Sequence, residues 1–179
     1  MNQKPLVIAI AAVSGGGKTV ITNQLVDRLN NAKAMYFDNY EFDEYPDDIC
    51  KWVNDGADYN KWNITPLIKD IQILLNQSLH FIVLDYPFAY LHSGMREYID
   101  LAVFIDTPLD IAMARRILRD FSDAPIDGVL DDLTNYLSNG RTAYLEMQTV
   151  KANSDIVIDG SLPLEIIVDR IMEAVGKQV

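Results

Sequence analysis

The stretch AAVSGGGKT at residues 11–19 decides the fold of this 179-residue chain. It follows an apolar run of strand length, PLVIAIAA at residues 5–12, and leads into apolar residues at helical spacing that continue to Leu29. A strand that passes through glycines into a helix is the context that the phosphate-binding pattern G-x-x-x-x-G-K-[ST] requires. Residues 17–19 match the end of this pattern, whereas Ala12 stands at its first glycine. The sequence therefore predicts a phosphate-binding loop with one altered position.

An alanine at position 12 is compatible with such a loop, because alanine is strained only where the backbone needs a positive φ. Three consecutive glycines at 15–17 leave the bend free of side chains. We expect backbone amides of this bend, and the helix N-terminus after it, to bind phosphate oxygens. Lys18 would bridge the β- and γ-phosphates, and Thr19 would ligate Mg²⁺. The expected nucleotide-binding residues are Ser14, Gly15, Gly16, Gly17, Lys18, Thr19 and Val20, together with Arg115 from a later helix.

Four further apolar segments of strand length alternate with segments of helical periodicity along the rest of the chain. Buried strands that alternate with helices indicate a parallel sheet covered by helices on both faces. The prediction is one α/β domain over residues 1–179, in three layers around a five-stranded parallel sheet. Further strands are expected at 34–37, 80–85, 101–106 and 154–159, and helices at 66–75, 109–121, 127–150 and 164–175.

The composition limits the partners and the setting of this domain. The formal net charge is −11, with a sequence pI of about 4.4, so the whole-molecule field repels nucleic acid and anionic lipid surfaces. The single cysteine forms no internal disulfide, and the N-terminus lacks the pattern of a signal peptide. No apolar run approaches the roughly 20 residues that span a bilayer. We expect a cytoplasmic protein that binds neither nucleic acid nor membrane, and the sequence leaves a homo-oligomer open.

Two aspartates at the ends of expected strands are candidates for phosphoryl-transfer chemistry. In doubly wound sheets, ligands bind beyond the carboxyl ends of the strands. Asp85 ends the apolar segment FIVLD, which has the form of a Walker B segment, so we assign it to the Mg²⁺ side. Asp38 opens an acidic and aromatic segment, and we assign it as the base for the acceptor hydroxyl. Which of the two is the base stays open, and either could instead be a helix cap or a turn residue.

Three arginines, Arg115, Arg116 and Arg119, stand within five positions of an expected helix. Spacings of three and four residues place Arg119 on a common face with both others. Such a cluster can stabilise the charge on a transferring phosphoryl group, and we interpret residues 115–141 as a lid-like region. The alternative is that these arginines pair with nearby acids and favour the helix dipole.

Residues 36–64 form the expected acceptor-binding segment. Eight of the seventeen aromatic residues lie between Tyr36 and Trp62, and eight acids lie between Asp38 and Trp62. Rings offer stacking surfaces, and carboxylates suit a neutral polyol while repelling an acceptor that already carries phosphate. The alternative is that the acids are solvated and the rings anchor a loop to the core. The candidate substrate residues are Asp38, Tyr40, Trp62 and Asn63, with Tyr86 and Phe88 after the third strand.

Several segments together resemble the uridine kinase and phosphoribulokinase group of P-loop small-molecule kinases. The resemblance rests on AAVSGGGKT, YFDNY, NKWNITPL, REYIDLAVFIDTPLDIAMARRILRD and SDIVIDG, and so runs over most of the chain. It implies a P-loop kinase fold, ATP and Mg²⁺ as cofactors, Asp38 as the base, and Arg116 and Arg119 as lid-side phosphate contacts beside the catalytic Lys18. The chain departs from the uridine kinase pattern at Asp85-Tyr86 and at Asn63, so the resemblance leaves the acceptor open.

The leading hypothesis is an ATP-dependent kinase that phosphorylates a hydroxyl of a small metabolite, with a nucleoside favoured. A kinase for another alcohol, such as a vitamin or a sugar derivative, is one alternative. A second is a regulatory protein that hydrolyses or senses ATP or GTP, and a third is a relative that binds metabolite without catalysis. The N-K-x-D loop of GTPases is absent, and the arginines and the acceptor-like segment favour transfer.

Overall fold

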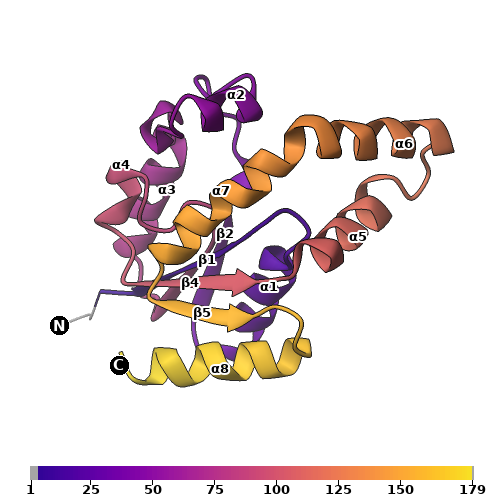
Figure 1. Cartoon of the computed structure of the whole chain (residues 1–179). Coiled ribbons are helices and arrows are strands. Elements are labelled where there is room, and N and C mark those ends of the chain that lie inside the picture. The colour runs from indigo at the N-terminus through magenta and orange to yellow at the C-terminus, as the bar shows by residue number, and fades with distance from the viewer. Residues whose placement is uncertain (1–3, 179) are drawn as a thin grey trace.

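A five-stranded parallel sheet forms the centre of the protein (Figure 1), as residues 4–178 of the computed structural model describe it. The strand order is β2-β3-β1-β4-β5, and every neighbouring pair is parallel. β1 is central and apolar throughout because helices cover both of its faces. The predicted fold class is therefore confirmed. The strands are β1 (Leu6–Ala12), β2 (Ala32–Tyr36), β3 (Phe81–Asp85), β4 (Leu101–Asp106) and β5 (Ile156–Asp159).

Alternate side chains of β1 enter two separate cores, as the two-residue period of a strand requires. Val7, Ala9 and Ala11 face one core, which α2, α3, α4 and α7 close. Ile8 and Ile10 face the other core, against α1 and α8. The helices are α1 (Lys18–Arg28), α2 (Ile49–Asn54), α3 (Thr65–Leu75), α4 (Ser93–Arg96), α5 (Leu109–Asp120), α6 (Ile126–Asn135), α7 (Arg141–Ala152) and α8 (Leu164–Gly176), with short turns η1 (Phe37–Asn39), η2 (Tyr59–Lys61) and η3 (Tyr136–Gly140).

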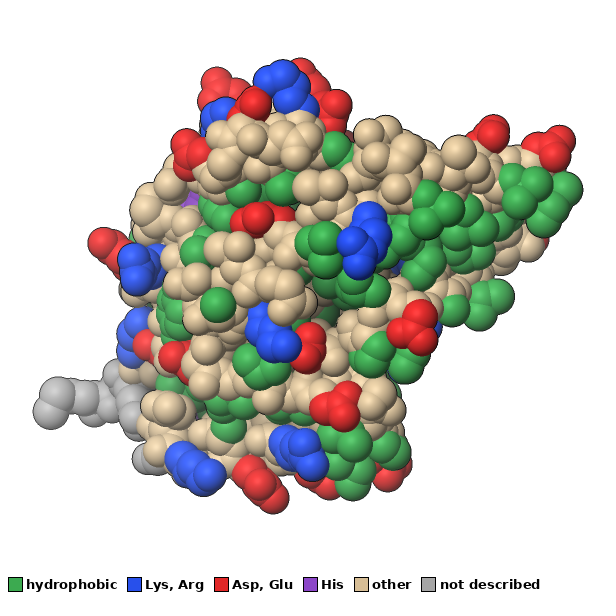
Figure 2. Space-filling model, viewed as in Figure 1, with side chains coloured by type: hydrophobic (Ala, Val, Ile, Leu, Met, Phe, Trp, Pro, Cys, Tyr) green, Lys and Arg blue, Asp and Glu red, His purple; other side chains and the backbone are tan. Residues whose placement is uncertain are grey.

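The segment expected as one mostly helical stretch at 127–150 is divided into α6, the π-helical turn η3 and α7. Together with α5 these elements form an arm that projects from the sheet (Figure 1), where the lid-like region was expected. α6 buries no residue, and hydrophobic side chains gather along the arm in Figure 2. The exposed large hydrophobic residues of α5, α6 and η3 are Leu118, Ile126, Leu130 and Leu137.

None of the helices between residues 4 and 178 is both long enough and apolar enough to span a membrane.

The second strand begins two residues earlier than expected, and Phe37 already belongs to the turn η1. This turn lies at the carboxyl end of β2, next to the end of β3, because the two strands pair in register from Ala32 with Phe81 to Tyr36 with Asp85. The sheet therefore brings Asp38 and Asp85 to the same edge.

Candidate active site

The loop between β1 and α1 has a backbone that only glycine adopts readily at two positions. Gly15 has a φ of +77° and Gly17 a φ of +98°. A Cβ at Gly15 would also lie 2.1 Å from the backbone oxygen of Ala112, on α5. α5 therefore packs directly against the bend. The Gly16 amide closes the bend by donating to the carbonyl oxygen of Val13 at 2.8 Å, and the N-terminus of α1 follows the bend, where helix amides can bind an anion.

Ala12 is an ordinary residue of β1, where it pairs with Ile105 of β4. It is absent from the non-glycine residues with positive φ in the described part of the chain, so the expectation of an unstrained alanine is confirmed. The glycine bend is held in place by Thr107, whose Oγ1 donates to the carbonyl oxygen of Gly16 at 2.9 Å. Sequence reasoning missed this threonine, which follows β4 and fastens the loop to the sheet.

Thr19 and Asp85 meet beneath the loop. The Thr19 hydroxyl donates to Oδ2 of Asp85 at 2.6 Å, and Asp85 is only 4% exposed at the end of β3. Burial raises the pKa of Asp85, which Asp38 raises further, while Lys18 and the Thr19 hydroxyl oppose the rise. A hydroxyl and a carboxylate side by side are oxygen donors of the kind that Mg²⁺ takes, with waters and phosphate filling its other positions. These two residues fit a magnesium site.

A cavity of about 400 Å³ opens beside the loop and contains both Lys18 and Asp38. Asp38 is exposed in η1, and Lys18 is half-buried at the start of α1. The cavity thus combines the lysine of the phosphate loop with a wall of rings. The remaining lining residues are Ala12, Val13, Ser14, Phe37, Ile49, Trp52, Tyr59, Trp62, Pro87, Phe88, Ala143, Tyr144, Glu146 and Met147.

The rings of the aromatic wall pack on one another, with Trp62 edge to face on Trp52 and tilted against Phe88. Trp62 lies 5.2 Å from Phe88 and 6.4 Å from Trp52, measured between ring centroids. The Trp52 indole N–H donates to the carbonyl oxygen of Asp58 at 2.9 Å, and this bond holds its ring across the segment. The expected substrate residues Trp62 and Phe88 do line the cavity beside Asp38.

The three arginines of α5 point to three different places. Arg119 reaches the phosphate loop, with its Nη2 3.5 Å from Oγ of Ser14, and it also pairs with Asp120. The Arg116 guanidinium binds Asp132 of α6 with both terminal nitrogens, so it faces the arm. Arg115 lines a second cavity, of about 250 Å³, with Gly16, Gly17 and Val20. The three guanidinium groups therefore do not gather on the expected common face, and Arg119 is the arginine whose guanidinium lies at the loop.

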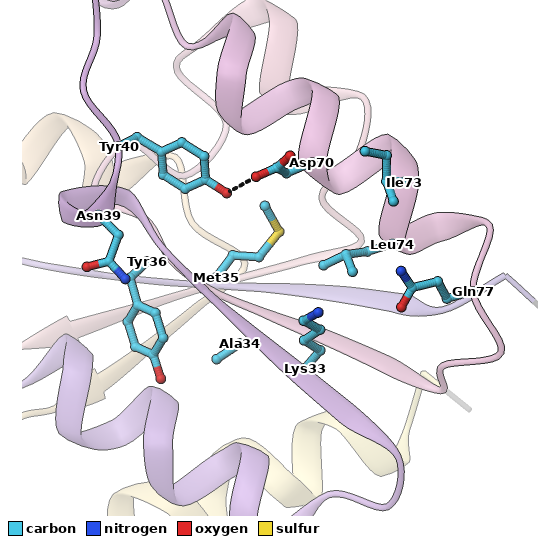
Figure 3. A pocket seen from close by; sticks show the side chains of 10 residues that line it. All are labelled: Lys33, Ala34, Met35, Tyr36, Asn39, Tyr40, Asp70, Ile73, Leu74 and Gln77. Atoms are coloured by element: carbon cyan, nitrogen blue, oxygen red, sulfur yellow. Dashed lines mark hydrogen bonds between the residues drawn. The ribbon is translucent and has the colours of Figure 1, made fainter.

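Three expected substrate residues lie outside the cavity. Tyr40 donates to Asp70 at 2.8 Å across a groove of about 480 Å³ between β2 and α3, as Figure 3 shows. Asn63 accepts hydrogen bonds from the backbone and hydroxyl of Thr65, at the start of α3, and lines a different hollow. Tyr86 is fully buried in the core. Tyr40 also lines a further cavity of about 580 Å³ together with Asp38 and Trp62. The structure therefore places Asn63 and Tyr86 apart from Asp38, and a substrate role for Tyr40 stays a prediction.

Helix α7 supplies cavity residues that sequence reasoning missed, namely Tyr144, Glu146 and Met147. Tyr59 was missed as well, although it stands inside the aromatic segment. No motif marks α7, and only its return from the arm over the sheet brings it to the phosphate loop (Figure 1). The abundance of rings in residues 36–64 was the one signal that pointed to Tyr59.

A glycine loop, a buried carboxylate beside its threonine and an adjacent acidic aromatic cavity form a site for phosphate chemistry, and a sequence comparison identifies its family. A profile of the Phosphoribulokinase / Uridine kinase family matches residues 54–162, more than half of the chain. The chain belongs to this family. The phosphoribulokinase and uridine kinase family consists of small-molecule kinases, so its fold and loop serve nucleotide binding and phosphoryl transfer.

Two curated relatives are similar to this chain in sequence, and a solved structure is similar to it in fold. The uridine kinase of Leuconostoc citreum (strain KM20) is 25% identical over 189 residues, covering 88% of this chain and 89% of that protein. The uridine kinase of Oceanobacillus iheyensis is 26% identical over 186 residues, covering 88% and 87%. Shikimate kinase from Aquifex aeolicus shares the fold with a TM-score of 0.54 at 15% identity, over 97% of this chain and 98% of that one.

Proposed function

We propose that this protein transfers the γ-phosphate of ATP, with Mg²⁺, to a hydroxyl of a small metabolite bound in the 400 Å³ cavity. The observation that carries the proposal is that Lys18 of the phosphate loop and Asp38 line one cavity, with the Thr19–Asp85 pair beside it. A nucleotide on the loop would present its terminal phosphate to whatever fills that cavity. The family assignment supports a cytoplasmic kinase with a nucleotide and a small molecule as its substrates.

The donor side acts through positioning and charge. Amides of Gly15, Gly17 and Lys18, at the N-terminus of α1, would hold phosphate oxygens, and Lys18 would stabilise the charge that moves with the transferring group. Mg²⁺, held by Thr19 and Asp85, would neutralise charge on the β- and γ-phosphates. Arg119 lies where its guanidinium can reach the phosphates over Ser14. Arg115, beside Gly16 and Gly17, can contact the nucleotide from the other cavity.

On the acceptor side, Asp38 is favoured over Asp85 as the residue that takes the proton. Asp38 is exposed to the cavity, whereas Asp85 is buried, does not line the cavity and is bound to Thr19. Asp38 would accept a hydrogen bond from the acceptor hydroxyl and orient its oxygen toward the terminal phosphate. Trp62 and Phe88 would stack on the rest of the acceptor.

A nucleoside is the acceptor that the curated relatives favour, since those matched are uridine kinases. A non-nucleoside alcohol is the second candidate, favoured by the position of Asn63. Its side chain accepts from Thr65 and lies outside the cavity, so other residues would have to contact the acceptor there.

The test is transfer from γ-labelled ATP with Mg²⁺ to a panel of nucleosides, vitamins and sugar alcohols. At least one acceptor should gain label, and Lys18→Ala should weaken ATP binding and with it the transfer. Tight ATP binding without a labelled acceptor would contradict the kinase and favour a nucleotide-sensing protein.

A further inference from the structure

Glu146 and Tyr59 form a hydrogen-bonded pair on the wall of the cavity. The Tyr59 hydroxyl donates to Oε1 of Glu146 at 3.0 Å, which joins η2 to α7. Tyr59 is 6% exposed, and its burial, with the charge of Glu146, raises its pKa above the usual range. The tyrosine hydroxyl therefore stays protonated and donates steadily at neutral pH.

The second carboxylate oxygen of Glu146 is left for something else. Among residues 4–178, no cation pairs with Glu146 and no hydrogen bond reaches its Oε2. The side chain is half-buried, and it lines the cavity that also holds Asp38. A carboxylate in such a place is costly unless a partner arrives with a donor group.

The charges in the cavity set the kind of partner. Asp38 and Glu146 are its two carboxylates, and Lys18 is its one cation among the lining residues. Donor phosphates on the loop would engage Lys18, which leaves the acceptor facing negative charge and rings. A negatively charged acceptor would meet repulsion there, whereas a hydroxyl or an ammonium could donate to Glu146.

We propose that Glu146 is a specificity-determining residue, which accepts a hydrogen bond from a second polar group of the acceptor, and that Tyr59 positions its carboxylate. The acceptor class is an alcohol that carries a further hydroxyl or ammonium group and no negative charge. This inference rests on the proposed function, because it places the acceptor in the same cavity.

Glu146→Gln separates this role from a merely structural one. The amide oxygen of glutamine still accepts from Tyr59, so the link between η2 and α7 persists while the charge is lost. If Glu146 only linked η2 to α7, this variant would keep the ligand selectivity of the wild type. Tyr59→Phe removes the donor and leaves the charge, and should therefore weaken binding less. Glu173→Gln, at an exposed position on α8, is the matched control.

Tryptophan fluorescence measures binding without turnover, because the chain has two tryptophans and both line the cavity. Each titration contains Mg²⁺ and a saturating non-hydrolysable ATP analogue, so that phosphates engage Lys18 and the probe faces the two carboxylates. The probes are uridine, pyridoxine, pyridoxamine, shikimate and methyl shikimate. Pyridoxine and pyridoxamine differ in a hydroxyl against an ammonium, and so identify which donor Glu146 prefers. Shikimate and its methyl ester differ in the negative charge.

We expect an uncharged or cationic probe to quench the fluorescence, and the methyl ester to bind more tightly than shikimate. Glu146→Gln should weaken the tightest such probe by about tenfold, the scale of a charged hydrogen bond. It should also bring the affinities for shikimate and its ester together, whereas Glu173→Gln should match the wild type. Thermal unfolding should show both variants folded.

Three results would overturn the inference. They are equal binding of shikimate and its ester by the wild type, a change within about twofold in Glu146→Gln, and no quenching by any probe up to about 10 mM. A probe that quenches in the expected pattern and yet gains no label from ATP would instead remove the kinase proposal and leave the role of Glu146 in binding intact.

Discussion

The phosphate loop is built from neighbouring residues, whereas the acceptor cavity beside it is built from residues far apart in the chain. The loop occupies positions 12–19, and its shape follows from two glycines with positive φ. The cavity combines η1, α2, η2, the loop after β3 and helix α7, up to Met147. Local backbone rules thus decide where the donor binds, while long-range packing decides what can accept the phosphate.

Asp38→Asn should abolish the acceptor chemistry while sparing the donor side, and it should have the largest effect of the substitutions described below. Asparagine keeps the size of the side chain and loses the base, so transfer should fall by about 10³-fold. ATP affinity should stay unchanged, as nucleotide titration would measure. Retained turnover would remove Asp38 as the base.

Gly15→Ala should break the donor side. The new Cβ would meet the backbone oxygen of Ala112 at 2.1 Å, at a φ of +77°. The loop or α5 must move, so ATP affinity should fall by about 100-fold and stability by about 3 kcal/mol. Calorimetry would measure both quantities.

Gly128→Ala is the matched control for that change, because a Cβ at Gly128 in α6 would meet nothing within 4 Å. It should leave ATP affinity as it is and stabilise the helix by up to about 1 kcal/mol. Equal losses in both glycine variants would refute the steric explanation.

Arg119→Ala and Arg116→Ala distinguish a catalytic arginine of α5 from a structural one. Arg119 lies at Ser14 and is largely exposed, so its loss should lower turnover about tenfold or more and leave stability unchanged. Arg116 binds Asp132, so its loss should cost about 2 kcal/mol of stability. Steady-state kinetics measures turnover, and thermal unfolding measures stability. If Arg116→Ala lowered turnover and Arg119→Ala lowered stability instead, the arm would have to move Arg116 to the phosphates.

Asp85→Asn should have the smallest effect on the stability of the isolated protein, and the sign of this effect should depend on pH. Burial is the main cause of the raised pKa of Asp85, so the folded state binds its proton more tightly than the unfolded state does. Wild-type stability should fall as the pH rises through the folded pKa, and this fall should be absent in the variant.

At neutral pH the asparagine should therefore stabilise the fold by about 1 kcal/mol. Because the variant also lacks the carboxylate that would hold Mg²⁺, its ATP affinity should no longer depend on Mg²⁺. Unfolding across a pH series and ATP titrations with and without Mg²⁺ measure these effects. A variant that is destabilised and still responds to Mg²⁺ would place the metal elsewhere.

The sequence predicted β1, the glycine bend and α1 well because their signals are local. An apolar run, three glycines and a helical period are read within residues 5–29, and the alternation of strands and helices predicts the sheet. Strand-end acids are also predictable, because parallel strands end at one edge, and Asp38 and Asp85 do meet there.

The acceptor side could be predicted only in part, because side-chain direction in irregular segments depends on distant packing. Tyr40 binds Asp70 and Asn63 binds Thr65, and both partners belong to α3. Glu146 reaches the cavity only because the arm returns over the sheet as α7. Composition marked residues 36–64 as rich in rings, but no spacing rule distinguishes a ring in the cavity from one that faces away.

A single-turnover measurement tests the central claim, that one cavity joins the donor and acceptor sites. Protein loaded with γ-labelled ATP and Mg²⁺ is mixed rapidly with an acceptor that quenches the fluorescence of Trp52 and Trp62. We expect label to appear in the acceptor within one turnover. Label that stays on ATP, or that appears only as inorganic phosphate while the acceptor is bound, would contradict it.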